Sequence, residues 1–296
     1  MKIKIIPDSS CGLTKEQALE LGWDLLPIRA EIDNKTYEIG VNITVDEFAK
    51  IWRANKKVDA LTFATPPGQA QILVDKYLAE GYDMILFYPI SNKLSSQTNS
   101  LKTFFKDNKQ VYVVDSIKIS YLIFRDLLLF DEKIKAGEKF EDAIKHFSKN
   151  EERTILIPEF NDALVKGGRL SKSAAAIAKL LKIVPVIKFD EKGALEKESI
   201  GRVFNKMVEK YANELIDEKS SQNSENHYFI IMHSNNLNIK EFVKKIKENK
   251  NLKNPVLVSN LSTEIAIHTG IGAICMVYVK IDEEIKETVL KYFEQV

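Results

Sequence analysis

The chain has 296 residues, 45% of them hydrophobic and 29% charged, and its 43 Lys and Arg residues against 42 Asp and Glu give a formal net charge of +1. This length and composition are typical of a globular protein of about two domains and exclude a disordered or collagen-like chain. The balanced charge argues against a nucleic-acid partner or a polybasic membrane contact, because both need a concentrated basic face. Only six of the basic residues are Arg, so each Arg is a position of interest.

Neither the cysteines nor the apolar runs suggest an extracellular or membrane protein. Cys11 and Cys275 are far apart and form no CxxC motif, so we expect neither a metal site nor a disulfide framework. The longest uninterrupted apolar run, Ala273–Val279, is far shorter than the roughly 18 residues of a membrane span. With no signal-peptide pattern at the start, we expect a cytoplasmic protein without an integral membrane segment.

Strand and helix patterns alternate along the chain. Thr14 and Thr44 each begin a capping box, completed by Gln17 and Glu47. Apolar stripes at helical spacing follow at Leu73/Tyr77/Leu78 and at Ile239/Phe242/Val243/Ile246, and an alanine-rich helix is predicted over Ser173–Leu181. Several predicted strands are nearly uncharged, as strands buried on both faces are. The predicted strands, in chain order, are Lys2–Ile6, Leu25–Ile32, Met84–Ile90, Val111–Asp115, Thr154–Pro158, Val184–Asp190, Tyr228–Ser234, Pro255–Asn260 and Ala273–Val279.

This alternation predicts an α/β protein with largely parallel sheets. The polar stretch Lys145–Arg153 divides the chain near its middle. We therefore predict two α/β domains, residues 1–152 and 153–296, with a ligand cleft between them.

Four strand-to-helix turns of the first half carry hydroxyl groups. They contain Asp8-Ser9-Ser10, Ser91–Ser96, Asp115-Ser116 and Thr62–Gly68. Each alone is explained by helix capping, which Ser, Thr and Asp commonly provide. Because ligands of open α/β sheets bind at the carboxyl ends of strands, four such turns together favour a polar, anion-binding cleft.

Two motifs of the second half add an arginine and a histidine. Lys166-Gly167-Gly168-Arg169 contains a flexible Gly-Gly turn, and His268 lies in His268-Thr269-Gly270-Ile271-Gly272 before the last predicted strand. The glycine spacing fits neither a Walker A loop nor a dinucleotide fingerprint, so no nucleotide cofactor is indicated.

A hydrolase or acyl transferase is the alternative interpretation of these residues. Ser95 or Ser9 would be the nucleophile, His268 the base and Asp8 or Asp115 the orienting carboxylate. No GxSxG motif supports it. A purely structural protein is compatible with everything except the clustered turns.

Four of these segments, in this order and spacing, resemble the DegV family of bacterial fatty-acid-binding proteins, which includes the binding subunits of a bacterial fatty acid kinase. They are Asp8-Ser9-Ser10, Ile90-Ser91-Asn92-Lys93-Leu94-Ser95, Lys166-Gly167-Gly168-Arg169-Leu170-Ser171 and His268-Thr269-Gly270-Ile271-Gly272. Leu26-Pro27-Ile28, Val114-Asp115-Ser116 and Gly201-Arg202 extend the similarity along nearly the whole chain.

The resemblance implies a binding protein without a cofactor or a catalytic residue of its own. It assigns the carboxylate of a long-chain fatty acid, such as palmitate, to the hydroxyls of Thr62 and Ser95, with the acyl tail in an apolar tunnel. Such a protein serves lipid transport or fatty acid metabolism, or presents the acid to a separate ATP-dependent kinase subunit. Further positions near the pocket or the partner are Ser9, Ser96, Arg169, Arg202 and His268.

This chain departs from the family pattern in three places. The threonine motif reads Thr62-Phe63-Ala64-Thr65-Pro66 where the family has a sequence close to Thr-Ser-Gln-Pro-Ser. Ser96 stands where a glycine is usual, followed by Gln97-Thr98 in place of Thr-Tyr, and Ile271 replaces a common proline.

Overall fold

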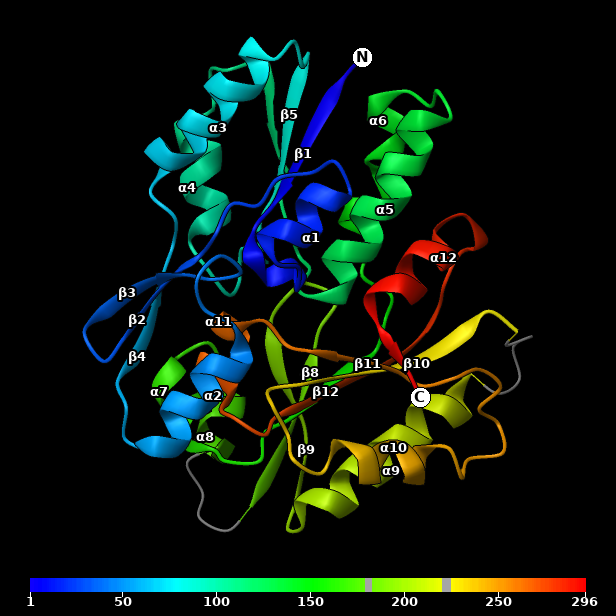
Figure 1. The fold of residues 1–296 in the computed structure, drawn as a ribbon. Coiled ribbons are helices and arrows are strands. Elements are labelled where there is room, and N and C mark those ends of the chain that lie inside the picture. The colour runs from blue at the N-terminus through cyan, green and yellow to red at the C-terminus, as the bar shows by residue number, and fades with distance from the viewer. Residues whose placement is uncertain (179–182, 220–224) are drawn as a thin grey trace. The chain divides into compact units, whose positions relative to one another are not determined.

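The computed structural model describes residues 1–178, 183–219 and 225–296, so the end of the predicted helix Ser173–Leu181 lies partly outside the described residues. The chain forms two compact units, each of mixed α/β structure as predicted (Figure 1). The first unit contains Met1–Asn150 and Ser262–Glu264; the second contains Glu151–Leu261 and Ile265–Val296. The predicted division into residues 1–152 and 153–296 differs from these units, because it places Ser262–Glu264 in the second domain.

The first unit is built on two three-stranded sheets. A parallel sheet has the order β1-β5-β6, and Ile5 lies opposite Leu86 in it. An antiparallel sheet has the order β3-β2-β4. The strands are β1 (Ile3–Pro7), β2 (Arg29–Ile32), β3 (Lys35–Glu38), β4 (Ala60–Phe63), β5 (Met84–Tyr88) and β6 (Val111–Val113).

Helices cover both faces of the parallel sheet, with α3 and α4 on one side and α5 on the other (Figure 1). Val74, Tyr77 and Leu101 pack against Ile85 and Phe87 in one buried cluster. Both predicted capping boxes are present, at the starts of α1 and α2. The helices are α1 (Lys15–Glu20), α2 (Val45–Ala54), α3 (Pro67–Ala79), α4 (Gln97–Phe104), α5 (Tyr121–Lys135) and α6 (Phe140–Ala143), with single 3₁₀ turns η1 (Ser9–Cys11) and η2 (Lys145–Ser148).

The second unit contains one seven-stranded sheet of order β13-β11-β10-β12-β7-β8-β9. Its core joins the sheet to α9 and α10, with Phe229 and Ile231 against Phe242 and Leu215. Its elements are β7 (Thr154–Ile157), α7 (Asp162–Gly167), α8 (Lys172–Ala178), β8 (Val184–Phe189), β9 (Leu195–Gly201), α9 (Phe204–Glu218), β10 (His227–His233), α10 (Ile239–Ile246), β11 (Leu257–Asn260), α11 (Thr263–Thr269), β12 (Ile274–Lys280), α12 (Glu283–Tyr292) and β13 (Glu294–Gln295). The first two residues of α11, Thr263 and Glu264, belong to the first unit.

The prediction of largely parallel sheets holds for β1-β5-β6 but not for the seven-stranded sheet. There β10 and β11 pair in parallel, whereas every other pair is antiparallel. The length of the connection accounts for two of these pairings, β10–β11 and β8–β9. A whole helix, α10, separates β10 from β11, whereas β8 and β9 are joined by a tight turn in which Asp190 Oδ1 accepts the N–H groups of Lys192 and Ala194.

Candidate functional site

The end of β1 is fixed to the end of β5 by a buried carboxylate. One oxygen of Asp8 accepts N–H and O–H from Ser10, and the other accepts the N–H of Ile90 at 2.7 Å. Burial raises the pKa of Asp8 to about 6, although these hydrogen bonds oppose the rise. Asp8 therefore positions the loop that begins at Ile90 and carries Ser95.

Ser9 is buried and fully engaged within the first unit. Its Oγ donates to Oε1 of Glu264 at 3.0 Å and accepts the N–H of Ile28 at 3.1 Å. Burial, reinforced by the charge of Asp8, raises the pKa of Glu264 to about 8. These contacts favour a structural role for Ser9.

Thr62 lies within strand β4, and not in a turn before a helix as its sequence suggested. It is half-buried and pairs with Ala30 of β2. The chain leaves the strand through Ala64 to the buried Thr65, whose Oγ1 donates to the carbonyl of Pro27 at 2.6 Å. The hydrogen bond of Thr65 thus fixes the chain just after the strand that carries Thr62.

The loop between β5 and α4 carries Ser95, whose half-buried Oγ accepts the N–H of Gln97 at 3.2 Å. Ser96 is exposed at the N-cap position of α4 and makes no capping hydrogen bond. Thr98 anchors the loop, because its hydroxyl donates to the carbonyl of Ile90 at 2.9 Å.

Gln97 joins the loops that bear Thr62 and Ser95. Its side chain is fully buried, and its Oε1 accepts the backbone N–H of Thr65 at 2.8 Å. Its Nε2 is also buried and has no hydrogen-bond partner among the residues that the structure describes. A buried donor without an acceptor is costly, so this amide marks a place where an acceptor would be stabilising.

In the second unit the structure brings Arg169 and His268 together. His268 lies on α11, and Gly167 packs so closely against it that a Cβ would lie 3.0 Å from its Nδ1. Burial and then the charge of Arg169 lower the pKa of His268 to about 4. Arg169 itself is exposed and donates to the carbonyl of Gly167 at 2.6 Å. The glycine is therefore needed for close approach to the histidine.

Arg202 lies away from Arg169 and His268. The Arg169 turn is tied to the start of β9, where the N–H of Ser171 donates to the carbonyl of Leu195 at 3.1 Å. Arg202 follows the other end of β9, about 20 Å farther along at the usual rise of a strand. It is exposed, and no ion pair of Arg202 is found among the described residues.

The geometry does not favour the hydrolase alternative. The charge that acts on His268 is a cation, and a pKa near 4 makes its imidazole a weak general base. Asp115 is exposed and binds Lys102 at 3.1 Å and the amide of Asn92 at 2.8 Å. Asp8 is engaged with Ser10 and Ile90, so neither proposed carboxylate is a free orienting group.

Two residues that sequence analysis did not single out as site residues are Gln97 and Glu264. The signal for Gln97 was present, since it departs from the family pattern two residues after the binding serine. Glu264 had no local signal, because its partner Ser9 is 255 residues away in the sequence.

Residues 1–178, 183–219 and 225–296, which the structure describes, contain neither a metal-binding cluster nor a membrane-spanning helix. No group of three or more His, Cys, Asp or Glu side chains there is arranged to hold a metal ion. None of the helices in these ranges combines the length and the apolar character of a membrane span.

The chain is a mixed α/β protein of two units with hydroxyl groups at strand ends, and sequence comparison identifies its family. A sequence model described as "Uncharacterised protein, DegV family" matches residues 2–280. A DegV domain-containing protein of Mycoplasmopsis pulmonis is 40% identical over 295 residues, covering 99% of this chain and 100% of that protein. The chain therefore belongs to the DegV family.

Solved structures of the same fold include proteins described by a fatty acid ligand. A DegV family protein from Thermus thermophilus, described by its fatty acid binding, has a TM-score of 0.80 at 19% identity and covers 95% of this chain and 100% of its own. DegV of Bacillus subtilis, described as a fatty acid binding protein, has a TM-score of 0.78 at 23% identity, covering 94% and 100%. A stearic acid-binding protein from Eubacterium ventriosum has a TM-score of 0.78 at 21% identity, covering 93% and 98%.

Proposed function

We propose that this protein binds one long-chain fatty acid, with the carboxylate at Thr62 and Ser95 and the acyl tail enclosed by apolar side chains. The ligand class is supported by family membership and by the fatty acid binding stated for three structures of the same fold, one of them with stearic acid. Burial of the tail would supply most of the affinity, at about 0.8 kcal/mol per CH₂ group.

The observation that carries the proposal is the link made by Gln97. Its hydrogen bond to Thr65 connects the chain segments of Thr62 and Ser95, and its buried Nε2 lacks an acceptor among the described residues. A carboxylate has two acceptor oxygens and can accept from two hydroxyls and an amide at once. The N-terminal end of α4, which begins at Gln97, adds a favourable field for an anion.

The first test removes both hydroxyls. Thr62→Val combined with Ser95→Ala should weaken palmitate binding, because each charge-assisted hydrogen bond contributes about 1.5–3 kcal/mol, or roughly 10- to 100-fold in affinity. Calorimetric titration of the delipidated protein measures the loss. Thr36→Val on exposed β3 and Ser148→Ala in the exposed η2 turn are matched controls that should bind normally. Unchanged palmitate affinity in the double variant would refute the assignment.

The second test converts the buried donor into an acceptor. Gln97→Glu retains an oxygen for the N–H of Thr65 but places a carboxylate where we propose that Nε2 faces the ligand. Binding of palmitate should weaken more than about tenfold at neutral pH and recover in part at acidic pH, when the introduced carboxyl group is protonated and donates again. Binding of hexadecanol should change much less, because the neutral alcohol has no charge to be repelled. Equal losses for acid and alcohol would indicate a structural role only.

We further propose that the protein performs no chemistry alone and presents the acid to a separate kinase subunit. Arg202 is the side chain that we assign to this contact, because it is exposed and unpaired within the described part of the chain. Arg202→Ala should retain palmitate binding and lower acyl phosphate formation in a coupled assay with the kinase subunit. Equal phosphorylation by both proteins would exclude Arg202 from that contact.

A further inference from the structure

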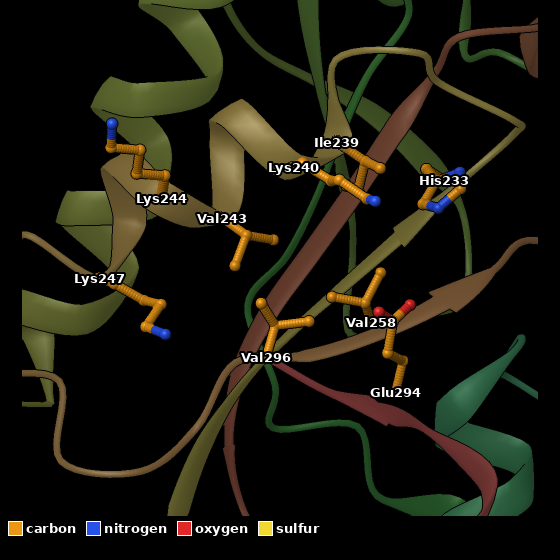
Figure 2. A pocket seen from close by; sticks show the side chains of 9 residues that line it. All are labelled: His233, Ile239, Lys240, Val243, Lys244, Lys247, Val258, Glu294 and Val296. Carbon is orange, nitrogen blue, oxygen red and sulfur yellow. The ribbon is translucent and has the colours of Figure 1, made fainter.

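A separate cavity lies in the second unit, between α10 and the strands beside it (Figure 2). Its volume is about 330 Å³, which lies within the range of small-molecule sites. It contains none of the residues discussed above as fatty-acid-binding positions. The cavity is lined by His233, Ile239, Lys240, Val243, Lys244, Lys247, Val258, Glu294 and Val296.

The floor of this cavity is aliphatic. Val243 and Val258 belong to the core of the unit and are 2% and 6% exposed, and the half-buried Ile239 extends that surface. Val296 remains 38% exposed, although its backbone pairs with that of Val256 at the sheet edge. An alkyl group placed here would cover the part of Ile239 and Val296 that is accessible to water.

The rim of the cavity is basic. Lys240, Lys244 and Lys247 follow one another at helical spacing along α10 and the residue after it, and no ion pair of theirs is found in the described part of the chain. Lys245, on the same helix but outside the cavity, pairs with Glu248 at 3.5 Å. In Figure 2 Lys240 and Lys247 stand on either side of Val243, whereas Lys244 points away from Val258 and Val296.

Unpaired lysines at this spacing repel one another, so the rim gains from a bound anion. Glu294 is the one acidic side chain of the lining and opposes such binding at its end of the cavity. None of the nine lining residues is Phe, Tyr or Trp, so the cavity offers no stacking platform for a nucleobase.

We propose that this cavity binds an amphiphilic phosphate, with the phosphate between Lys240 and Lys247 and a short alkyl body directed toward Val258 and Val296. A phosphate monoester carries up to about two negative charges near neutral pH and can interact with lysines on two sides. A single carboxylate carries one charge and gains less from a second lysine. This site is independent of the proposed carboxylate site at Thr62 and Ser95.

The test is calorimetric titration with octyl phosphate of protein first saturated with palmitate, so that the proposed fatty acid site is occupied. Octanoate and octanol are the comparison ligands, and vesicles containing phosphatidic acid test whether the same head group is taken from a membrane. We expect octyl phosphate to bind about tenfold more tightly than octanoate, and octanol to bind least. Equal affinities for octyl phosphate and octanol would overturn the proposal. Binding to the vesicles but not to octyl phosphate would overturn the assignment to a free amphiphile.

Charge variants locate the site. Lys240→Gln combined with Lys247→Gln should weaken octyl phosphate binding by roughly five- to tenfold. Each lysine should contribute about as much binding free energy as a partly exposed ion pair. Lys245→Gln is the matched control on the same helix and should bind as the unmodified protein does. Glu294→Gln should strengthen binding about two- to threefold, an effect that a merely structural residue would not produce. Failure of the double lysine variant to weaken binding would place the ligand elsewhere.

Discussion

Replacing Asp126 by Asn should lower the free energy of unfolding of the first unit by about 3–5 kcal/mol, because it leaves a buried cation uncompensated. Nζ of Lys118 donates to Oδ2 of Asp126 at 2.5 Å, and the hydroxyl of Tyr88 donates to the same oxygen at 2.8 Å. Lys118 and Asp126 are each 1% exposed. Burial and the charge of Asp126 raise the pKa of Tyr88, so the phenol remains a donor.

The loss of unfolding free energy can be measured for the first unit by tryptophan fluorescence, because both tryptophans, Trp23 and Trp52, lie in that unit. Trp23 makes an edge contact with Phe124 of α5, the helix that carries Asp126, with ring centroids 6.2 Å apart. Urea unfolding followed by selectively excited tryptophan fluorescence therefore reports directly on the packing around this ion pair.

Two comparisons separate the charge effect from general disruption of the core. Lys145→Met removes an exposed pair with Asp142 in the same unit and should change the stability little, because water screens the pair. Lys118→Met combined with Asp126→Leu and Tyr88→Phe removes the buried ion pair together with the phenol that donates to it and should recover most of the stability. The explanation fails if the triple variant is as unstable as Asp126→Asn, or if Asp126→Asn costs no more than loss of the exposed pair.

The strands buried on both faces were predictable because their composition is dictated by burial. β5 and β12 are runs of apolar residues, and both lie within a residue or two of the predicted ranges. β9, with the sequence Leu-Glu-Lys-Glu-Ser-Ile-Gly, was missed because it is the edge strand of its sheet and carries three charged side chains. Periodicity of apolar residues gives little signal for a strand of this kind.

The candidate site was predictable only in part. The hydroxyl of Ser95 follows a strongly apolar strand, so its place at a strand end could be derived from the sequence. The link between Gln97 and Thr65 spans 32 residues, and the bond between Ser9 and Glu264 spans 255. Such pairings depend on the topology of the chain, which local patterns do not specify, and they decide which hydroxyls are already engaged.

The stability of the first unit should fall as pH rises, and Glu264→Gln should remove much of this fall. The carboxyl of Glu264 has a pKa of about 8 in the folded protein, against an ordinary value of 4.5. Between these two pH values the folded protein retains a proton that the unfolded chain releases. Unfolding therefore becomes easier by up to about 1.4 kcal/mol for each unit of pH, or roughly 4 kcal/mol over the window.

Asp8 contributes in the same direction at lower pH, because its pKa is raised from 3.8 to about 6. The contribution of Glu264 is therefore best isolated between about pH 6 and pH 8. Glutamine mimics the neutral carboxyl and retains an oxygen that can accept the hydroxyl of Ser9, so Glu264→Gln should preserve the fold.

Urea unfolding at several pH values, again followed by tryptophan fluorescence, measures this dependence. The unmodified protein should lose stability steadily between about pH 6 and pH 8, and Glu264→Gln should show a nearly flat profile there. Glu16→Gln, at an exposed position of α1 in the same unit, should reproduce the unmodified slope. Parallel profiles for the unmodified protein and Glu264→Gln would mean that Glu264 is already ionised in the folded state, and that its contact with Ser9 is a charged one.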